Sequence, residues 1–278
     1  MSITILPSTG AFIGRVNGRD HRPLLAVCGG ITAEAYEFMM YESFYPRAEA
    51  ILGDFCATGL SFPVFHVEKR LSEYIATGNA DDYSEALSRF TVNCRAAVRL
   101  GAEKLVLHLW NGMASDTHFE RHLDAFSALS EIAAAHGLLL TVENVVCAHR
   151  DPLVHFSELL ARYPDVAFTY DSKMAAFHRQ EYRIFDGEYR PLWEGHIRHI
   201  HFNDYNGIPG DFSRLAVLHL GEGNIDITRF ASGLSEVGYC GTVTLECSCM
   251  CPDGSLVPEK MNASLALARR LLASERKE

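Results

Sequence analysis

The stretch Leu138–Asn144, which reads LLLTVEN, decides the interpretation of the fold. It is a run of apolar and β-forming residues that ends in a glutamate and an asparagine, a pattern typical of a buried strand with polar side chains at its carboxyl end. Three later stretches repeat it: VAFTYD at Val166–Asp171, IRHIHFN at Ile197–Asn203 and TVTLE at Thr242–Glu246. Each stretch delivers one ligand-type side chain, and the four side chains are Glu143, Asp171, His201 and Glu246.

These four side chains predict a divalent-metal site. Carboxylates and an imidazole suit Mg²⁺, Mn²⁺, Co²⁺ or Zn²⁺. A single glutamate at a strand end is more often part of a salt bridge, and a single aspartate is more often a helix cap. Periodicity leaves His199 open as a competitor of His201, because side chains two residues apart share one face of a strand.

Strand-like and helix-like segments alternate along the whole chain. Further strands are expected at Ser2–Leu6, Ala35–Tyr41, Ser61–Val67 and Lys104–Leu109. Helices are expected at Pro23–Gly29, Pro46–Ala57, Asp81–Leu100, Thr117–His136, from Asp151 to before Pro164, Ile225–Val237 and Pro258–Ala273. Eight strand–helix units over residues 1–278 predict a single-domain (β/α)8 TIM barrel, with the active site at the C-terminal ends of the strands. A doubly wound open sheet is the alternative, but no GxGxxG follows an early strand.

Composition narrows the function classes. The chain has 278 residues, a formal net charge of −10 and no strong run of Lys or Arg, which disfavours a nucleic-acid partner. No stretch resembles a signal peptide or a membrane span, so a cytoplasmic protein with reduced cysteines is expected. The CxCxC motif of Cys247, Cys249 and Cys251 has no second cysteine pair at zinc-ribbon spacing, which favours buried side chains and loop thiols.

The chain resembles the xylose isomerase-like TIM-barrel superfamily, which includes sugar isomerases and epimerases, inosose dehydratase and endonuclease IV. The matching pieces are TVEN with Glu143, FTYD with Asp171, HIHFND with His201, HLGEG at His219–Gly223 and TLE with Glu246. The resemblance implies one divalent metal ion held by Glu143, Asp171, His201 and Glu246. It also implies that the two glutamates form the acid/base pair.

The endonuclease IV branch adds two strand-end histidines, and His66 and His108 stand at the corresponding places. They are candidates for a second metal ion or for substrate hydrogen bonds. The branch also has DxxH after its sixth strand, where this chain has Met174 at the fourth position, and DxH before GEG, where this chain has Leu215 and Val217. These departures argue against a third metal site.

The combined prediction is a divalent-metal-dependent isomerase or epimerase of a small sugar or polyol-derived carbonyl compound. A metal ion polarises the carbonyl, and two carboxylates remove and return the neighbouring proton. The alternatives are an endonuclease IV-like two-metal phosphodiester hydrolase and an inosose dehydratase-like lyase, and a homo-oligomer is compatible with each. Candidate substrate contacts, with turn or surface roles as their alternatives, are Glu42, Asn144, Lys173, Asn203, Asp204 and Glu222.

Overall fold

A parallel β-sheet organises the protein. The computed structural model describes residues 3–274, in which eight strands form one sheet of order β1-β8-β7-β6-β5-β4-β3-β2. The strands are β1 (Thr4–Pro7), β2 (Ala35–Met39), β3 (Ser61–His66), β4 (Lys104–Leu107), β5 (Leu139–Glu143), β6 (Ala167–Asp171), β7 (Ile197–His201) and β8 (Thr242–Leu245). The strand pairs with a defined register are parallel. This is the strand arrangement of a (β/α)8 TIM barrel, so the predicted fold class is confirmed.

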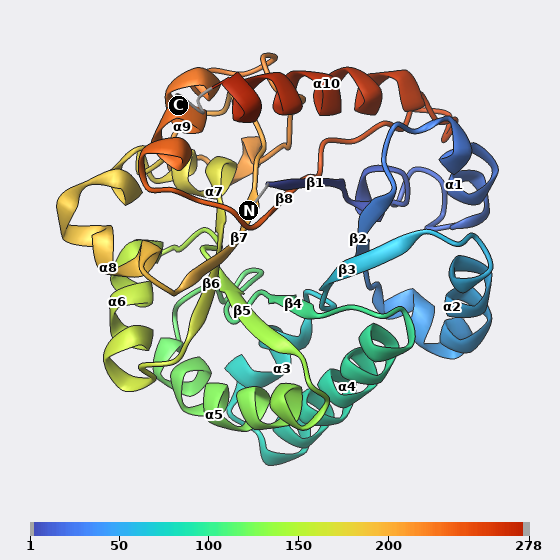
Figure 1. The fold of residues 1–278 in the computed structure, drawn as a ribbon. Coiled ribbons are helices and arrows are strands. Elements are labelled where there is room, and N and C mark those ends of the chain that lie inside the picture. The colour runs from blue at the N-terminus through green and yellow to red at the C-terminus, as the bar shows by residue number, and fades with distance from the viewer. Residues whose placement is uncertain (1–2, 275–278) are drawn as a thin grey trace. The chain divides into compact units, whose positions relative to one another are not determined.

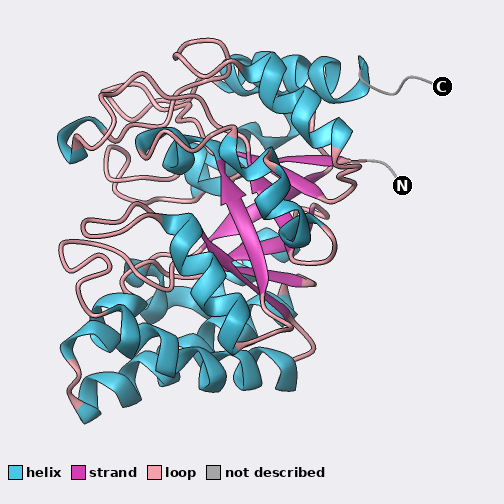
Figure 2. Ribbon diagram, turned by 90° about the vertical axis from the view of Figure 1, so that its left-hand side faces the viewer, coloured by secondary structure: helices cyan, strands magenta, loops and turns pink. Residues whose placement is uncertain are grey.

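Helical segments follow the strands, as the colouring by secondary structure makes visible (Figure 2). The α-helices are α1 (Arg22–Val27), α2 (Ala48–Cys56), α3 (Leu71–Thr77), α4 (Ala80–Arg99), α5 (Phe119–Ala135), α6 (Pro152–Arg162), α7 (Ser172–Phe177), α8 (Arg190–Trp193), α9 (Ile227–Glu236) and α10 (Pro258–Ser274). Short 3-10 helices lie at Thr9–Ala11, Cys28–Gly30, Glu42–Arg47, Arg183–Phe185, Gly187–Tyr189 and Phe212–Arg214. None of the described helices is long and apolar enough to cross a membrane.

The main difference from the predicted elements is helix α3, which the periodicity did not indicate. It has seven residues and ends at Gly78, whose φ of 70° is in the left-handed region that favours glycine. Asn79 then caps α4, because its side-chain oxygen accepts from the backbone N–H groups of Asp81 and Asp82. Most predicted strands are one or two residues too long, and Ser2, the predicted start of the first strand, lies outside the described residues.

The chain forms two compact units. The discontinuous unit comprises the described residues up to Tyr36 and from Tyr170, and the continuous unit comprises Glu37–Thr169. In the discontinuous unit, α10 packs against β1 and α9 (Figure 1). In the continuous unit, α4 packs against α3 and α5 (Figure 1). The single-domain organisation stays a prediction.

Each unit has an aromatic core. In the continuous unit, Phe38 stacks on Phe65 at 5.2 Å between ring centroids and meets the ring of Phe55 edge-on at 5.2 Å. In the discontinuous unit, Phe230 of α9 stacks on Phe202 at 5.3 Å, and both are fully buried. This packing fixes the strands from which the candidate site residues project.

Candidate metal and active site

A cluster of three ligand-type side chains lies at the strand ends of the discontinuous unit. Asp171 ends β6, His201 ends β7 and Glu246 directly follows β8. Their ligand atoms lie within 4.8 Å of one another. His201 Nδ1 is 3.8 Å from Asp171 Oδ2 and 3.4 Å from Glu246 Oε2, and the Glu246 side chain is only 9% exposed. Two buried carboxylates and an imidazole that face one another suit a divalent cation.

Asn203 holds the two carboxylates of this cluster. Its Nδ2 donates to Asp171 Oδ2 at 3.1 Å and to Glu246 Oε2 at 3.0 Å. Its Oδ1 accepts from the backbone N–H of Glu246 at 3.0 Å. The substrate contact of Asn203 stays a prediction, and both ends of its amide form hydrogen bonds within the protein. The structure therefore makes it a positioning residue for the carboxylates.

Asp171 combines the two roles that the sequence left open. Its Oδ1 accepts from the backbone N–H of Met174 at 2.9 Å and so caps α7, while its Oδ2 faces His201. Of the two histidines on β7, His201 has its Nδ1 3.4 Å from Glu246 Oε2, whereas the Nδ1 of His199 bonds the hydroxyl of Thr242 at 2.6 Å. The structure thus groups His201 with Asp171 and Glu246.

A second cluster lies at the strand ends of the continuous unit. His66 ends β3, Glu143 ends β5 and His108 directly follows β4. Glu143 Oε2 lies 3.4 Å from His66 Nε2 and 2.8 Å from His108 Nε2. All three side chains are buried. The structure therefore places His66 and His108, the candidates for a second metal ion or for substrate hydrogen bonds, in contact with Glu143.

Hydrogen bonds fix the orientation of both imidazoles. The Nδ1 of His66 lies 2.8 Å from the carbonyl oxygen of Val67, which can only accept, so Nδ1 carries the hydrogen. The Nδ1 of His108 lies 3.2 Å from Asn111 Oδ1. Because Asn111 Nδ2 donates to the carbonyl of Lys69 at 3.1 Å, its oxygen faces His108 and again accepts. In this tautomer, the Nε2 atom of each ring faces Glu143.

Two imidazole nitrogens that face a carboxylate could hold a cation. Burial lowers the pKa of His108 to about 4, so its ring is neutral at pH 7. A second proton on this ring is therefore disfavoured. Two imidazole nitrogens and a carboxylate oxygen are a donor set for Zn²⁺ and related ions, so the residues fit a metal ion.

Four other residues predicted to contact substrate differ in burial and in hydrogen-bond partners. Glu42 pairs with Arg70 at 2.6 Å and with Arg89 at 3.1 Å, and the hydrogen bond from Arg89 contributes most to lowering its pKa. Asn144 is buried next to Glu143, and its backbone N–H donates to the Thr169 carbonyl at 3.3 Å. Glu222 is exposed, whereas Lys173 is buried in α7.

The substrate contact of Asp204 stays a prediction. In the structure its carboxylate accepts from four backbone N–H groups at 2.8–3.1 Å. The donors belong to Tyr205, Gly221, Gly223 and Ile225. These bonds fill the lone-pair sites of the carboxylate and close the loop after β7. A Cβ on Gly223 would lie 2.3 Å from Asp204 Oδ1, which explains the second glycine of the GEG motif.

Two positioning residues were not predicted. Asn111 orients His108, and the hydroxyl of Ser172 donates to the carbonyl of Asn203 at 2.6 Å, which joins the ends of β6 and β7. An asparagine or serine beside a strand end is ordinarily a turn residue. The sequence therefore carries no signal that separates these two from other loop residues.

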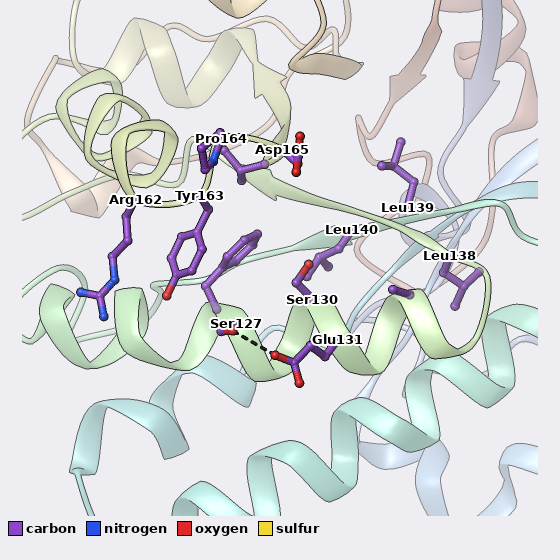
Figure 3. Close-up of a pocket in the computed structure, with 13 residues that line it drawn as sticks. Ser127, Ser130, Glu131, Leu138, Leu139, Leu140, Arg162, Tyr163, Pro164 and Asp165 are labelled. Carbon is purple, nitrogen blue, oxygen red and sulfur yellow. Dashed lines mark hydrogen bonds between the residues drawn. The ribbon is translucent and has the colours of Figure 1, made fainter.

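The continuous unit also has a cavity of about 370 Å³, whose lining includes none of the predicted site residues (Figure 3). It is lined by Ser127, Ser130 and Glu131 of α5 and by the segments Leu138–Leu140 and Arg162–Val166. The lining includes the amino-terminal start of β5 and the residues directly before β6. Active sites of TIM barrels form at the opposite, carboxyl ends of the strands, so we do not assign the candidate chemistry to this cavity.

Comparisons with known proteins agree with the fold. The chain is 14% identical to the IolI protein solved with a zinc atom, with a TM-score of 0.69 over 99% of this chain and 100% of that chain. It is 12% identical to D-psicose 3-epimerase of Clostridium cellulolyticum H10, solved with D-tagatose, with a TM-score of 0.70 over 97% and 99% of the two chains. At these identities the likeness shows the fold alone.

The sequence comparisons found one relative and one family model. An uncharacterised protein of Methanocaldococcus jannaschii is 25% identical over 191 residues, and the match spans about 60% of the length of that relative and 60% of this chain. The model of the xylose isomerase-like TIM-barrel family matches residues 33–271. The chain therefore belongs to the xylose isomerase-like TIM-barrel family.

Proposed function

We propose that the protein is a divalent-metal-dependent isomerase or epimerase of a small sugar or sugar-derived carbonyl compound. The observation that carries the proposal is the buried cluster of Asp171, His201 and Glu246, whose carboxylates Asn203 holds in place. The family and the 3-epimerase among its structural neighbours support this reaction class. A cytoplasmic location is part of the proposal.

Glu143 is proposed as the fourth ligand. It ends β5, and in a (β/α)8 barrel the carboxyl ends of all strands open on one face. A bound Mn²⁺, Mg²⁺, Co²⁺ or Zn²⁺ would supply Lewis-acid polarisation of a substrate carbonyl. The protein's own contribution is to hold the donors rigidly and to exclude water around them. The burial of Glu143, Asp171 and His201 and the 9% exposure of the Glu246 side chain favour this.

Glu143 and Glu246 are the proposed acid/base pair. Proton transfer next to a carbonyl requires one carboxylate to remove the proton from carbon and a second to return it. β5 and β8 are not neighbours in the sheet order, so the two glutamates approach a substrate from different strands. Return of the proton to the same carbon on the opposite face gives epimerisation, and its return to the next carbon gives isomerisation.

Deuterium exchange tests this proposal. The metal-loaded protein is incubated in D₂O with a panel of ketoses, aldoses, their phosphates and sugar acids, and NMR follows label at the carbon beside the carbonyl. We expect metal-dependent incorporation that Glu246→Gln abolishes without loss of the fold. Glu236→Gln, at the exposed end of α9, is the matched control and should retain full exchange. A fully active Glu246→Gln enzyme would contradict the proposal.

A second candidate function is the two-metal hydrolysis of phosphodiesters. It is favoured by one observation, the two histidine Nε2 atoms that face Glu143. Glu143 would then bridge two ions, which would clamp an in-line displacement from both sides. Incision of an abasic DNA duplex that EDTA abolishes and that His66→Ala/His108→Ala removes would support it. The formal net charge of −10 counts against it.

A further inference from the structure

Lys173 is an unusual residue in this protein. It is 5% exposed, and it is the only lysine or arginine in the buried class among residues 3–274. Within this described part of the chain, its ammonium group makes no hydrogen bond or ion pair. Lysine is almost never buried unless it is paired, because removing a charge from water is costly. The structure thus holds a positive charge without an internal partner.

The tip of Lys173 stays accessible. Its Nζ atom is not among the fully enclosed side-chain atoms that lack a hydrogen-bond partner in the described part of the chain. The stem is therefore buried while the ammonium group keeps contact with solvent, the arrangement by which a lysine presents its charge at the edge of an apolar surface. A ligand can reach this group.

Lys173 lies next to the metal-ligand cluster of the discontinuous unit. It belongs to the first turn of α7, which Asp171 caps through the backbone N–H of Met174. In the same turn, Ser172 bonds the backbone of Asn203, so the base of the lysine is anchored to the ends of β6 and β7. The backbone of Lys173 therefore lies two residues from Asp171, within one helical turn of this ligand of the carboxylate cluster.

The charge of Lys173 indicates which chemical group the substrate carries. A divalent cation would neutralise the two negative charges of Asp171 and Glu246. These carboxylates therefore do not need the positive charge of Lys173 as a partner. A neutral hydroxyl would leave the Lys173 charge uncompensated, whereas a phosphate or carboxylate would pair with it through a charge-assisted hydrogen bond. We propose that Lys173 binds an anionic group of the substrate, so that the substrate is a sugar phosphate or a sugar acid. This inference rests on the proposed function of the same site.

Anion binding to the metal-loaded protein tests the inference without turnover. Isothermal titration calorimetry measures inorganic phosphate and acetate against the wild type, Lys173→Met, Lys173→Arg and Lys260→Met. We expect Lys173→Met to weaken binding by about tenfold or more, since a hydrogen bond to a charged group is lost. Lys173→Arg should restore much of the affinity. Lys260→Met, an exposed lysine of α10, removes the same charge and should have no effect.

Each outcome decides the inference. A preference for phosphate supports a sugar phosphate, and a preference for acetate supports a sugar acid. Equal binding to the wild type and to Lys173→Met, or no binding to the wild type, would overturn the inference. Lys173→Met should also keep its metal content and melt no lower than the wild type, because it removes an uncompensated charge. A marked loss of stability or metal would reveal an internal partner and would equally overturn it.

The failure of the proposed function would look different. If deuterium exchange is absent while anion binding still depends on Lys173, the reaction class is wrong and the anion site remains. If exchange occurs on neutral sugars as well as on anionic ones, with the same loss in Lys173→Met for both, the reaction class holds and the substrate inference fails.

Discussion

Asn203 and Glu246 are joined by a reciprocal pair of hydrogen bonds. The Nδ2 of Asn203 donates to Glu246 Oε2 at 3.0 Å, and the backbone N–H of Glu246 donates to Asn203 Oδ1 at 3.0 Å. The same Nδ2 donates to Asp171, so one amide fixes the carboxyl groups that follow β6 and β8. Such contacts orient carboxylates toward a metal ion before it binds.

Asn203→Ala should therefore lower metal affinity by about 10–100-fold, the usual effect of losing a residue that orients metal ligands. Competition with a chromophoric chelator measures this change. Asn206→Ala is the control, because Asn206 is exposed three residues later in the same loop. Wild-type affinity in Asn203→Ala would show that the amide does not position the carboxylates.

Asp204→Ala should lower the free energy of unfolding by about 3 kcal/mol, because it leaves several backbone N–H groups without an acceptor. Denaturant titration of the metal-free protein gives this value. Asp211→Ala is the matched control in the same loop, where a partly exposed aspartate caps the short helix Phe212–Arg214, and its cost should stay below about 1 kcal/mol. Equal effects of the two substitutions would refute the structural role of Asp204.

His122 should make the protein acid-sensitive. Its Nε2 lies 3.1 Å from the carbonyl oxygen of Ser72 and so carries the hydrogen, and burial lowers the pKa of the ring to about 4 from 6.5. Because the unfolded chain binds the proton more readily, stability is complete above about pH 6.5 and is lost as the pH falls toward 4. The expected slope from this group is about 1.4 kcal/mol per pH unit within the window.

Denaturant titrations of the metal-free protein between pH 4 and 7 measure that slope. His122→Gln should reduce it, and the remaining slope should include His108, whose pKa is also lowered to about 4 by burial. His149→Gln, at an exposed position, should leave the slope unchanged. An identical slope in His122→Gln and the wild type would contradict this assignment.

The strands and their polar ends could be predicted because of how a parallel sheet is buried. Its strands are covered on both faces, so they read as apolar runs, and a charged residue at the end of such a run stands out. Glu143, Asp171, His201 and Glu246 were predicted as metal ligands in this way, and each lies at or directly after the end of a strand. Helix α3 was not predicted, because seven residues carry too little periodicity and only Gly78 marks its end.

The roles of neighbouring polar residues could not be predicted. Asn203 and Asp204 are adjacent polar residues after the same strand, and both were expected to contact substrate. In the structure, Asn203 faces the metal-ligand cluster, whereas Asp204 binds Gly221 and Ile225, 17 and 21 residues later. Such roles depend on the direction of each side chain and on the path of a long loop, and no local pattern encodes either.

The most direct test is the number of metal ions per chain, measured by elemental analysis on tag-free protein and two double variants. We expect one ion in the wild type, one in His66→Ala/His108→Ala and none in Asp171→Asn/His201→Ala. Two ions falling to one in the first variant would favour the two-metal hydrolase. A metal content that Asp171→Asn/His201→Ala leaves unchanged would contradict the proposed metal site and the isomerase or epimerase built on it.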